Sequence, residues 1–176
     1  LIRILTEGGA RQGFELLDTS GLLPHVLPEV ADMKGVQQPP QFHPEGDVWI
    51  HTLMMLEHLR NPTLTLALGV LLHDVGKPPT FRQAERIRFD GHAKTGAEMA
   101  AGILRRLRCS NDQIQQVESL VANHLRFMHA HEMKASTLKR FMRLERFEEH
   151  LELHRLDCLA SHGALDNYDL VKARYE

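Results

Sequence analysis

Apolar residues recur along most of the chain at spacings of three and four positions, which is the period of a helix with one buried face. Strict alternation of apolar and polar residues, typical of a half-buried strand, never lasts for more than a few positions. The pattern therefore predicts an all-α fold with about eight or nine helices. We expect them over residues 2–23, 24–33, 47–59, 64–72, 92–108, 111–125, 136–143, 145–161 and 166–175.

Local signals mark some of the helix ends. Ser110 and Gln113 have the spacing of a capping box, which predicts that a helix begins at residue 111. Asn61 and Pro62 are expected to be the N-cap and the first residue of the helix that continues through 64–72. In the charged stretch after this helix, residues 87–89 are the one short extended segment that we expect.

The stretch 35–45 contains three prolines, and each removes a backbone donor and restricts the residue before it. We therefore expect a hinge there, between a short helical neck (residues 1–40) and a larger helical domain (residues 41–176). Because the chain begins with Leu1 rather than Met, we also expect a trimmed chain or one piece of a longer polypeptide.

Composition narrows the classes of partner. The 21 Lys and Arg residues nearly balance the 23 Asp and Glu residues, so no global positive field attracts DNA, and any RNA contact must be local. The most apolar stretch, 64–72, is too short to span a bilayer, and no signal peptide precedes it, so we expect a cytoplasmic protein without a membrane partner. The two cysteines are far apart in sequence, which fits reduced thiols. The oligomeric state stays open.

Histidine is unusually frequent. Six of the 12 histidines lie inside or at the ends of largely apolar segments: His51, His58, His73, His92, His124 and His154. The pair His73-Asp74 ends the most apolar helix, so both side chains should emerge beside the core. A buried unpaired carboxylate is costly, and Asp74 must therefore be protonated, paired or bound to a cation. Lys77 places an ammonium group within a turn of the same point.

The helix 145–161, projected at 100° per residue, also indicates a carboxylate that is buried and needs a cation. Its acidic residues Glu145, Glu148, Glu149 and Glu152 share a face with Arg155, and we expect that face to meet water. The opposite face carries His150, His154, Asp157 and Ser161 between apolar neighbours. Burial of Asp157 again requires a cation.

His124 continues the inward face of its helix, and His51 and His92 lie in two further segments. A lone histidine on an apolar face is more often an ordinary core residue, but together these side chains could form a metal site in a helical bundle. A mixed histidine and carboxylate set suits Mn, Fe, Co, Ni or Zn and tolerates Mg. We expect one or two divalent ions. The first would be held by His51, His73, Asp74 and Asp157, and a second, bridged by Asp74, would lie near His92 and His124.

The series His51, His73-Asp74-Val-Gly-Lys77, Gly91-His92, Asn123-His124 and Leu156-Asp157 resembles the HD superfamily of metal-dependent phosphohydrolases. Residues 13–30, 47–51 and 137–140 further resemble the carboxy-terminal part of bacterial tRNA nucleotidyltransferases, the poly(A) polymerase and CCA-adding group. The resemblance covers nearly the whole chain and implies an HD-domain helical bundle with a short helical N-terminal neck. The polymerising head of that family is absent from this sequence. Leu125 follows His124 where some two-metal relatives carry another histidine, which argues against a complete second site.

The resemblance implies hydrolysis of nucleotide-type phosphomonoesters or 2′,3′-cyclic phosphodiesters, with a nucleotide or an RNA end as substrate. In this hypothesis Asp74 orients or deprotonates water, and Lys77, His92 and His124 stabilise charge on the phosphate. The alternative is a non-catalytic tRNA-binding body with a structural metal site. The basic residues that could bind RNA, or simply form solvated faces, are Arg105, Arg106, Arg108, Arg126, Lys139, Arg140 and Arg143. We expect His43, His129 and His131 to be solvated, and His150 and His154 to be core residues or neighbours of the site.

Overall fold

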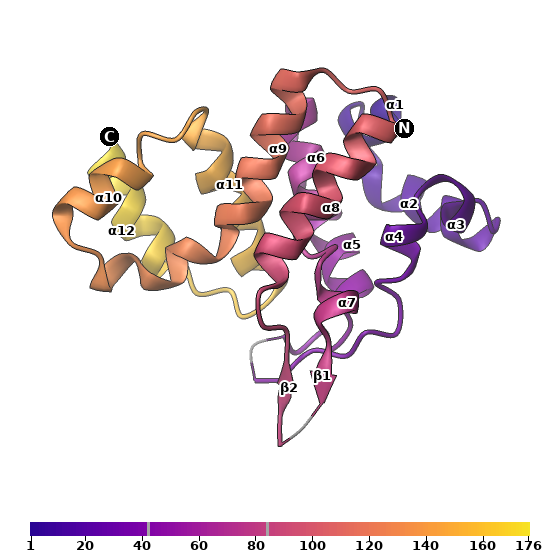
Figure 1. Ribbon diagram of the computed structural model, residues 1–176, viewed down its shortest axis with the longest axis horizontal. Coiled ribbons are helices and arrows are strands. Elements are labelled where there is room, and N and C mark those ends of the chain that lie inside the picture. The colour runs from indigo at the N-terminus through magenta and orange to yellow at the C-terminus, as the bar shows by residue number, and fades with distance from the viewer. Residues whose placement is uncertain (42, 84) are drawn as a thin grey trace.

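The computed structural model describes residues 1–41, 43–83 and 85–176, and within these ranges its regular secondary structure is almost entirely helical (Figure 1). The all-α prediction is confirmed. The helices in chain order are α1 (Ile2–Thr6), α2 (Ala10–Thr19), α3 (Leu23–Val26), α4 (Pro28–Ala31), α5 (Val48–His58), α6 (Leu64–Leu72), α7 (Lys77–Thr80), α8 (His92–Arg106), α9 (Asn111–Asn123), the 3₁₀ helix η1 (His124–Glu132), α10 (Ala135–Phe141), α11 (Phe147–Ala160) and α12 (Asp166–Tyr175). Strands β1 (Arg82–Gln83) and β2 (Ile87–Arg88) pair antiparallel as a small hairpin that projects from the body (Figure 1).

Helix α6 forms the centre of the main core, and every residue from Thr65 to Leu72 is buried. Helices α1, α5, α9 and α11 pack around it, and α8 lies along α9 (Figure 1). Such a helix needs no amphipathic pattern, because it meets apolar neighbours on all sides. Among the described residues, no helix combines the length and the apolar character that crossing a membrane requires.

The neck helices α1 to α4 contribute to this same core. Phe14 and Leu27 are fully buried in it, and the ring of Phe14 meets that of Trp49 edge-on at 6.4 Å between centroids. A second, smaller core lies at the C-terminal end of the molecule, around Phe127 and Phe141. The neck is thus fixed against α5 and α6, which carry part of the candidate site.

Some predicted helix boundaries are wrong for local reasons. The expected helix 2–23 is broken, because Gly8 and Gly9 have positive φ angles of 92° and 75° that end α1. Asn61 also has a positive φ, and the N-cap of α6 is Thr63, whose hydroxyl accepts a hydrogen bond from the backbone of Leu66. The capping box of Ser110 and Gln113 is confirmed at the start of α9. The expected extended segment is present as β2, but it pairs with a second strand, β1, that the sequence did not predict.

The expectation that Glu149 faces water is also wrong. Its side chain is buried beside the start of α6, where Thr63 and Thr65 donate hydrogen bonds to Oε1 at 2.6 and 2.8 Å. The amide of Gln116 donates to Oε2 at 3.0 Å. A helical projection does not reveal a neighbouring helix on the polar side, and here α6 and α9 supply donors that make burial of the carboxylate tolerable.

Gly76, between α6 and α7, lies against the start of α8 at unusually short range. A Cβ atom at this position would lie 2.2 Å from the carbonyl oxygen of His92 and 2.5 Å from the backbone nitrogen of Gly96. Only glycine permits this approach. The contact brings His92 next to the pair His73-Asp74 at the end of α6.

Candidate metal centre

Helix α6 ends in the interior of the molecule, and His73 and Asp74 follow it directly with exposed fractions of only 1% and 2%. One carboxylate oxygen of Asp74, Oδ2, lies 2.7 Å from Nζ of Lys77 and 3.1 Å from Nε2 of His73. Burial by itself would raise the pKa of Asp74. Attraction from His73 and Lys77 outweighs burial and holds this pKa well below its ordinary value, so the carboxylate is ionised.

Three imidazole rings around this carboxylate are oriented by the same type of backbone contact. The Nδ1 atoms of His73, His92 and His124 lie 2.9, 2.9 and 2.7 Å from the carbonyl oxygens of Val70, Phe89 and Val121. A carbonyl oxygen only accepts hydrogen bonds, so each Nδ1 carries a proton. In a neutral ring the lone pair then lies on Nε2, the nitrogen that faces away from the backbone.

The Nε2 atoms of His92 and His124 both face the other carboxylate oxygen of Asp74, Oδ1. The Nε2 atoms of His92 and His124 are 3.3 Å apart, and they lie 3.5 and 3.8 Å from Oδ1 of Asp74. Burial lowers the pKa of both rings, that of His124 to about 4, so both are neutral at pH 7. Within the described part of the chain, Oδ1 of Asp74 has no hydrogen-bond partner.

This spacing fits a cation. Ligand atoms about 2.1 Å from a tetrahedrally coordinated ion lie about 3.4 Å from one another, and the atoms of this group are separated by similar distances. Three acceptors with no proton to share repel one another, and a divalent ion would remove that cost. Asp74, His92 and His124 together offer one ligand atom each within 4.8 Å of the others.

A second group lies on the other side of His73 and consists of His51, His73 and Asp157. Nε2 of His51 is 3.1 Å from Oδ1 of Asp157, and the ring is completely buried. Burial lowers the pKa of His51, but the contacts with Asp157 and Glu45 outweigh it and raise the pKa to about 9. The contact with His51 likewise holds the pKa of Asp157 below its ordinary value against the opposing effect of burial. Positive charge is thus favoured at this point as well.

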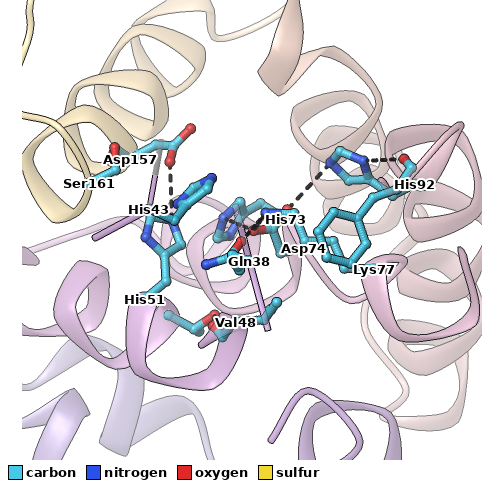
Figure 2. Close-up of polar contacts among 12 residues, drawn as sticks. Gln38, His43, Val48, His51, His73, Asp74, Lys77, His92, Asp157 and Ser161 are labelled. Atoms are coloured by element: carbon cyan, nitrogen blue, oxygen red, sulfur yellow. Dashed lines mark hydrogen bonds and ion pairs between the residues drawn. The ribbon is translucent and has the colours of Figure 1, made fainter. Parts of the chain in front are cut away.

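These two groups are continuous with a third, which His43, Glu45 and His51 form. Figure 2 shows His51, His43 and Asp157 on one side of the pair His73-Asp74, with His92 and Lys77 on the other side. Neighbouring imidazole rings in the series from His43 through His51, His73 and His124 to His92 have centroid distances between 5.0 and 5.5 Å. Helices α5, α6, α8, η1 and α11 all contribute to one centre.

The structure brings all of the predicted site residues together: His51, His73, Asp74, Lys77, His92, His124 and Asp157. Lys77 is buried, with its ammonium group bonded to Asp74 and to the side-chain oxygen of Gln38. His154 is a buried neighbour rather than part of either group, since its ring stacks on Phe127 with centroids 4.4 Å apart.

Two residues of the centre were missed. His43 was expected to be solvated, but its side chain is only 19% exposed and lies beside His51 (Figure 2). Glu45 is still more buried, with a side chain that is 4% exposed. Both residues lie in the proline-rich stretch 35–45, where no helical period indicates an inward face. Their closeness in sequence to His51 was the one available signal.

The centre opens into a pocket with a volume of about 460 Å³. Its floor is ionic, with Asp74, Lys77 and Asp157, whereas Phe89 and Met128 contribute apolar surface. Arg86 and Arg88 of the hairpin also line it. The further lining residues are Pro39, Gln41, His43, Ile87, Asp90, His92, His124, Leu125, His154, Cys158, Ser161 and His162.

Residues 47–158 match the family described as HD domain. The chain belongs to this family. A second match covers residues 1–34, with the description "Probable RNA and SrmB- binding site of polymerase A". The HD match contains every predicted ligand, and the second match covers the neck helices.

Three relatives are similar to this chain over almost all of its length. The chain is 36% identical over 185 residues to a CC-adding tRNA nucleotidyltransferase of Thermus thermophilus, with all of this chain and 42% of the relative covered. It is 32% identical to a multifunctional CCA protein of Pseudomonas paraeruginosa and 33% identical to one of Acinetobacter baumannii, each with 98% of this chain and 44% of the relative covered. The chain therefore spans less than half the length of these relatives.

Proposed function

We propose that this HD domain is a divalent-metal-dependent phosphohydrolase acting on nucleotide-type phosphomonoesters or 2′,3′-cyclic phosphodiesters, within a tRNA nucleotidyltransferase-like protein. The observation that carries the proposal is the convergence of Nε2 of His92, Nε2 of His124 and Oδ1 of Asp74 without a proton among them. Such a set of acceptors binds a cation and little else.

The residues divide into those that hold ions and those that act on substrate. Asp74, His92 and His124 would hold one ion, and His51, His73 and Asp157 would hold it jointly or hold a second one. A divalent ion bound there would polarise a phosphoryl oxygen and make water acidic enough to act as a nucleophile near neutral pH. The mixed nitrogen and oxygen donors favour Mn, Fe, Co, Ni or Zn over Mg.

The roles of the protein side chains follow from their charge and position. Asp74 is ionised, so its carboxylate can accept a hydrogen bond from an attacking water and fix its direction. Lys77 lies at the same floor, where its ammonium group can offset charge that develops on a phosphate. Phe89 and Met128 offer apolar surface for a nucleobase, and Arg86 and Arg88 offer donors for further phosphates.

The proposal is tested by measuring hydrolysis of 2′,3′-cyclic AMP, 3′-AMP and a generic phosphodiester across a series of divalent metals. We expect turnover that a chelator abolishes, and a loss of at least about 100-fold in Asp74→Asn. Asp112→Asn is the matched control, because this exposed aspartate on α9 pairs with Arg146 far from the centre. Turnover in Asp74→Asn equal to that of Asp112→Asn would refute the proposed role.

The match of residues 1–34 to an RNA-binding region favours a second candidate, a non-catalytic body that binds tRNA around a structural metal site. It predicts tRNA binding that weakens steeply with salt and no turnover of any phosphoester. Of the basic residues named for this role, Arg106 is paired with Glu29 on α4, and Arg126 stacks on the ring of Phe141. Phosphoester turnover that depends on Asp74 would decide against this candidate.

A further inference from the structure

The loop that joins the neck to α5, here called the linker loop (residues 35–41 and 43–47), is folded tightly against the metal centre. Except for residue 47, it lies between the two family matches, which cover residues 1–34 and 47–158. Its two ends are tied together, since the backbone of Gln38 donates to Gly46 at 2.8 Å and that of Val48 donates to Val36 at 3.0 Å. The loop is therefore an ordered part of the protein and not a loose tether.

Two buried side chains of the linker loop reach the centre. Gln38 is 1% exposed, and its side-chain oxygen accepts a hydrogen bond from Lys77, which anchors the loop beside Asp74 (Figure 2). Glu45 lies on the other side, where its Oε1 atom is 2.6 Å from Nδ1 of His51 and 2.9 Å from Nδ1 of His43. The second oxygen of Glu45 is buried without a hydrogen-bond partner among the described residues.

His51 lies between two carboxylates, and each of them faces a different nitrogen of its ring. One ring nitrogen, Nε2, faces Asp157 at 3.1 Å, and the other, Nδ1, faces Glu45. Oε1 of Glu45 is too close to Nδ1 for both atoms to bind one ion, because ligand atoms of a tetrahedral ion lie about 3.4 Å apart. The contact instead has the length of a charge-assisted hydrogen bond, but its angle leaves Nδ1 of His51 without a hydrogen bond among the described residues.

We propose that Glu45 is a positioning residue, whose carboxylate holds the Nδ1–H of His51 so that Nε2 is presented to the ion shared with His73 and Asp157. The inference rests on the proposed metal centre. His73, His92 and His124 donate Nδ1–H to backbone carbonyls, whereas the Nδ1 of His51 faces a carboxylate from the linker loop. A carboxylate in this position fixes the tautomer and the direction of the ring and makes the ligand nitrogen more basic.

The proposal is tested by measuring zinc and manganese affinity by competition with a coloured chelator in Glu45→Ala, Glu45→Gln and the wild-type chain. Loss of such an outer carboxylate weakens metal binding by about 10- to 100-fold, and we expect that loss in Glu45→Ala. The amide oxygen of Glu45→Gln can still accept the Nδ1–H, so it should restore most of the affinity. Glu29→Ala is the control, because Glu29 pairs with Arg106 outside the centre.

A second readout separates positioning from a general loss of structure. In zinc-loaded protein, nitrogen NMR should show Nδ1 of His51 protonated, with its proton protected from exchange in the wild type and in Glu45→Gln but not in Glu45→Ala. Metal affinity of Glu45→Ala equal to that of the wild type, or an Nδ1 proton still protected in that variant, would overturn the proposal. Wild-type protein that binds metal but hydrolyses nothing would refute the proposed catalysis alone, whereas wild-type protein without metal would refute both.

Discussion

Gly76 is the position where a single added carbon should disturb the centre most directly. In Gly76→Ala, the new methyl group would meet the oxygen of His92 at 2.2 Å, and the nitrogen and Cα of Gly96 at 2.5 and 2.8 Å. All three are backbone atoms, so no side chain can rotate away. Unstrained contacts need about 3.5 Å, and the start of α8 must therefore move by roughly 1 Å.

The magnitude follows from two opposing effects. Overpacking of this kind destabilises the folded protein by about 1–3 kcal/mol. Gly76 has an ordinary φ of −83°, so alanine also stabilises the protein by about 0.4–1 kcal/mol, because it lowers the conformational entropy of the unfolded chain. We expect a net loss of about 1–2 kcal/mol in the free energy of unfolding. Because His92 moves with α8, metal affinity should fall as well, since ligand distances tolerate only about 0.2 Å.

The assay is urea unfolding of the metal-free chain, followed by metal titration of the folded variants. Gly102→Ala is the matched control on α8, the helix that Gly76 contacts, because a Cβ there meets nothing within 4 Å. This variant should have a free energy of unfolding about 0.5–1 kcal/mol higher than that of the wild type, and it should bind metal with wild-type affinity. If Gly76→Ala were as stable as Gly102→Ala and bound metal equally well, the argument from close helix approach would be refuted.

Three further results are expected. In Glu149→Ala, loss of the carboxylate leaves buried donors of Thr65 and Gln116 unpaired, so urea unfolding should show a loss of about 2–3 kcal/mol, whereas Glu152→Ala should change little. Burial lowers the pKa of His150 to about 4, so the contribution of this neutral ring to the free energy of unfolding is complete above pH 6.5 and is lost between pH 6.5 and 4. The free energy of unfolding should therefore fall between pH 7.5 and 5.5, and His150→Gln should make that fall smaller by about 1 kcal/mol. Manganese at about 100 times its dissociation constant should stabilise the chain against thermal unfolding by about 2.7 kcal/mol, and a chelator should reverse this.

The residues of the centre were largely predictable because charged and imidazole groups interrupted apolar helical patterns. Asp74 follows nine residues of a helix that is buried on all sides, and Asp157 lies among core positions of α11. For Asp74 the sequence alone shows that a carboxylate must enter the core, whereas the expected burial of Asp157 is incomplete, because its side chain is 24% exposed and lines the pocket. The all-α class followed from the same periodicity, and the capping box at Ser110 marked one helix start correctly.

The errors arose where the surroundings, and not the local pattern, decide the outcome. Glu149 lies on the polar face of its helix, but donors from α6 and α9 cover it, and no local pattern in α11 reveals those neighbours. His43 and Glu45 belong to a loop whose path is set by backbone hydrogen bonds and by the anchor at Gln38. A loop has no helical period that would indicate which side chains face inward. Only the three-dimensional structure therefore shows that His43 and Glu45 belong to the centre.

The most direct test of the account is the metal content of the purified chain, measured by elemental analysis after dialysis against excess Mn, Co, Ni or Zn. We predict one or two ions per chain in the wild type and in Asp112→Asn, and a clear loss in Asp74→Asn, because Asp74 supplies the acceptor on which His92 and His124 converge. Wild-type protein without bound metal, or Asp74→Asn with an unchanged amount, would contradict the central claim that these side chains form a metal centre.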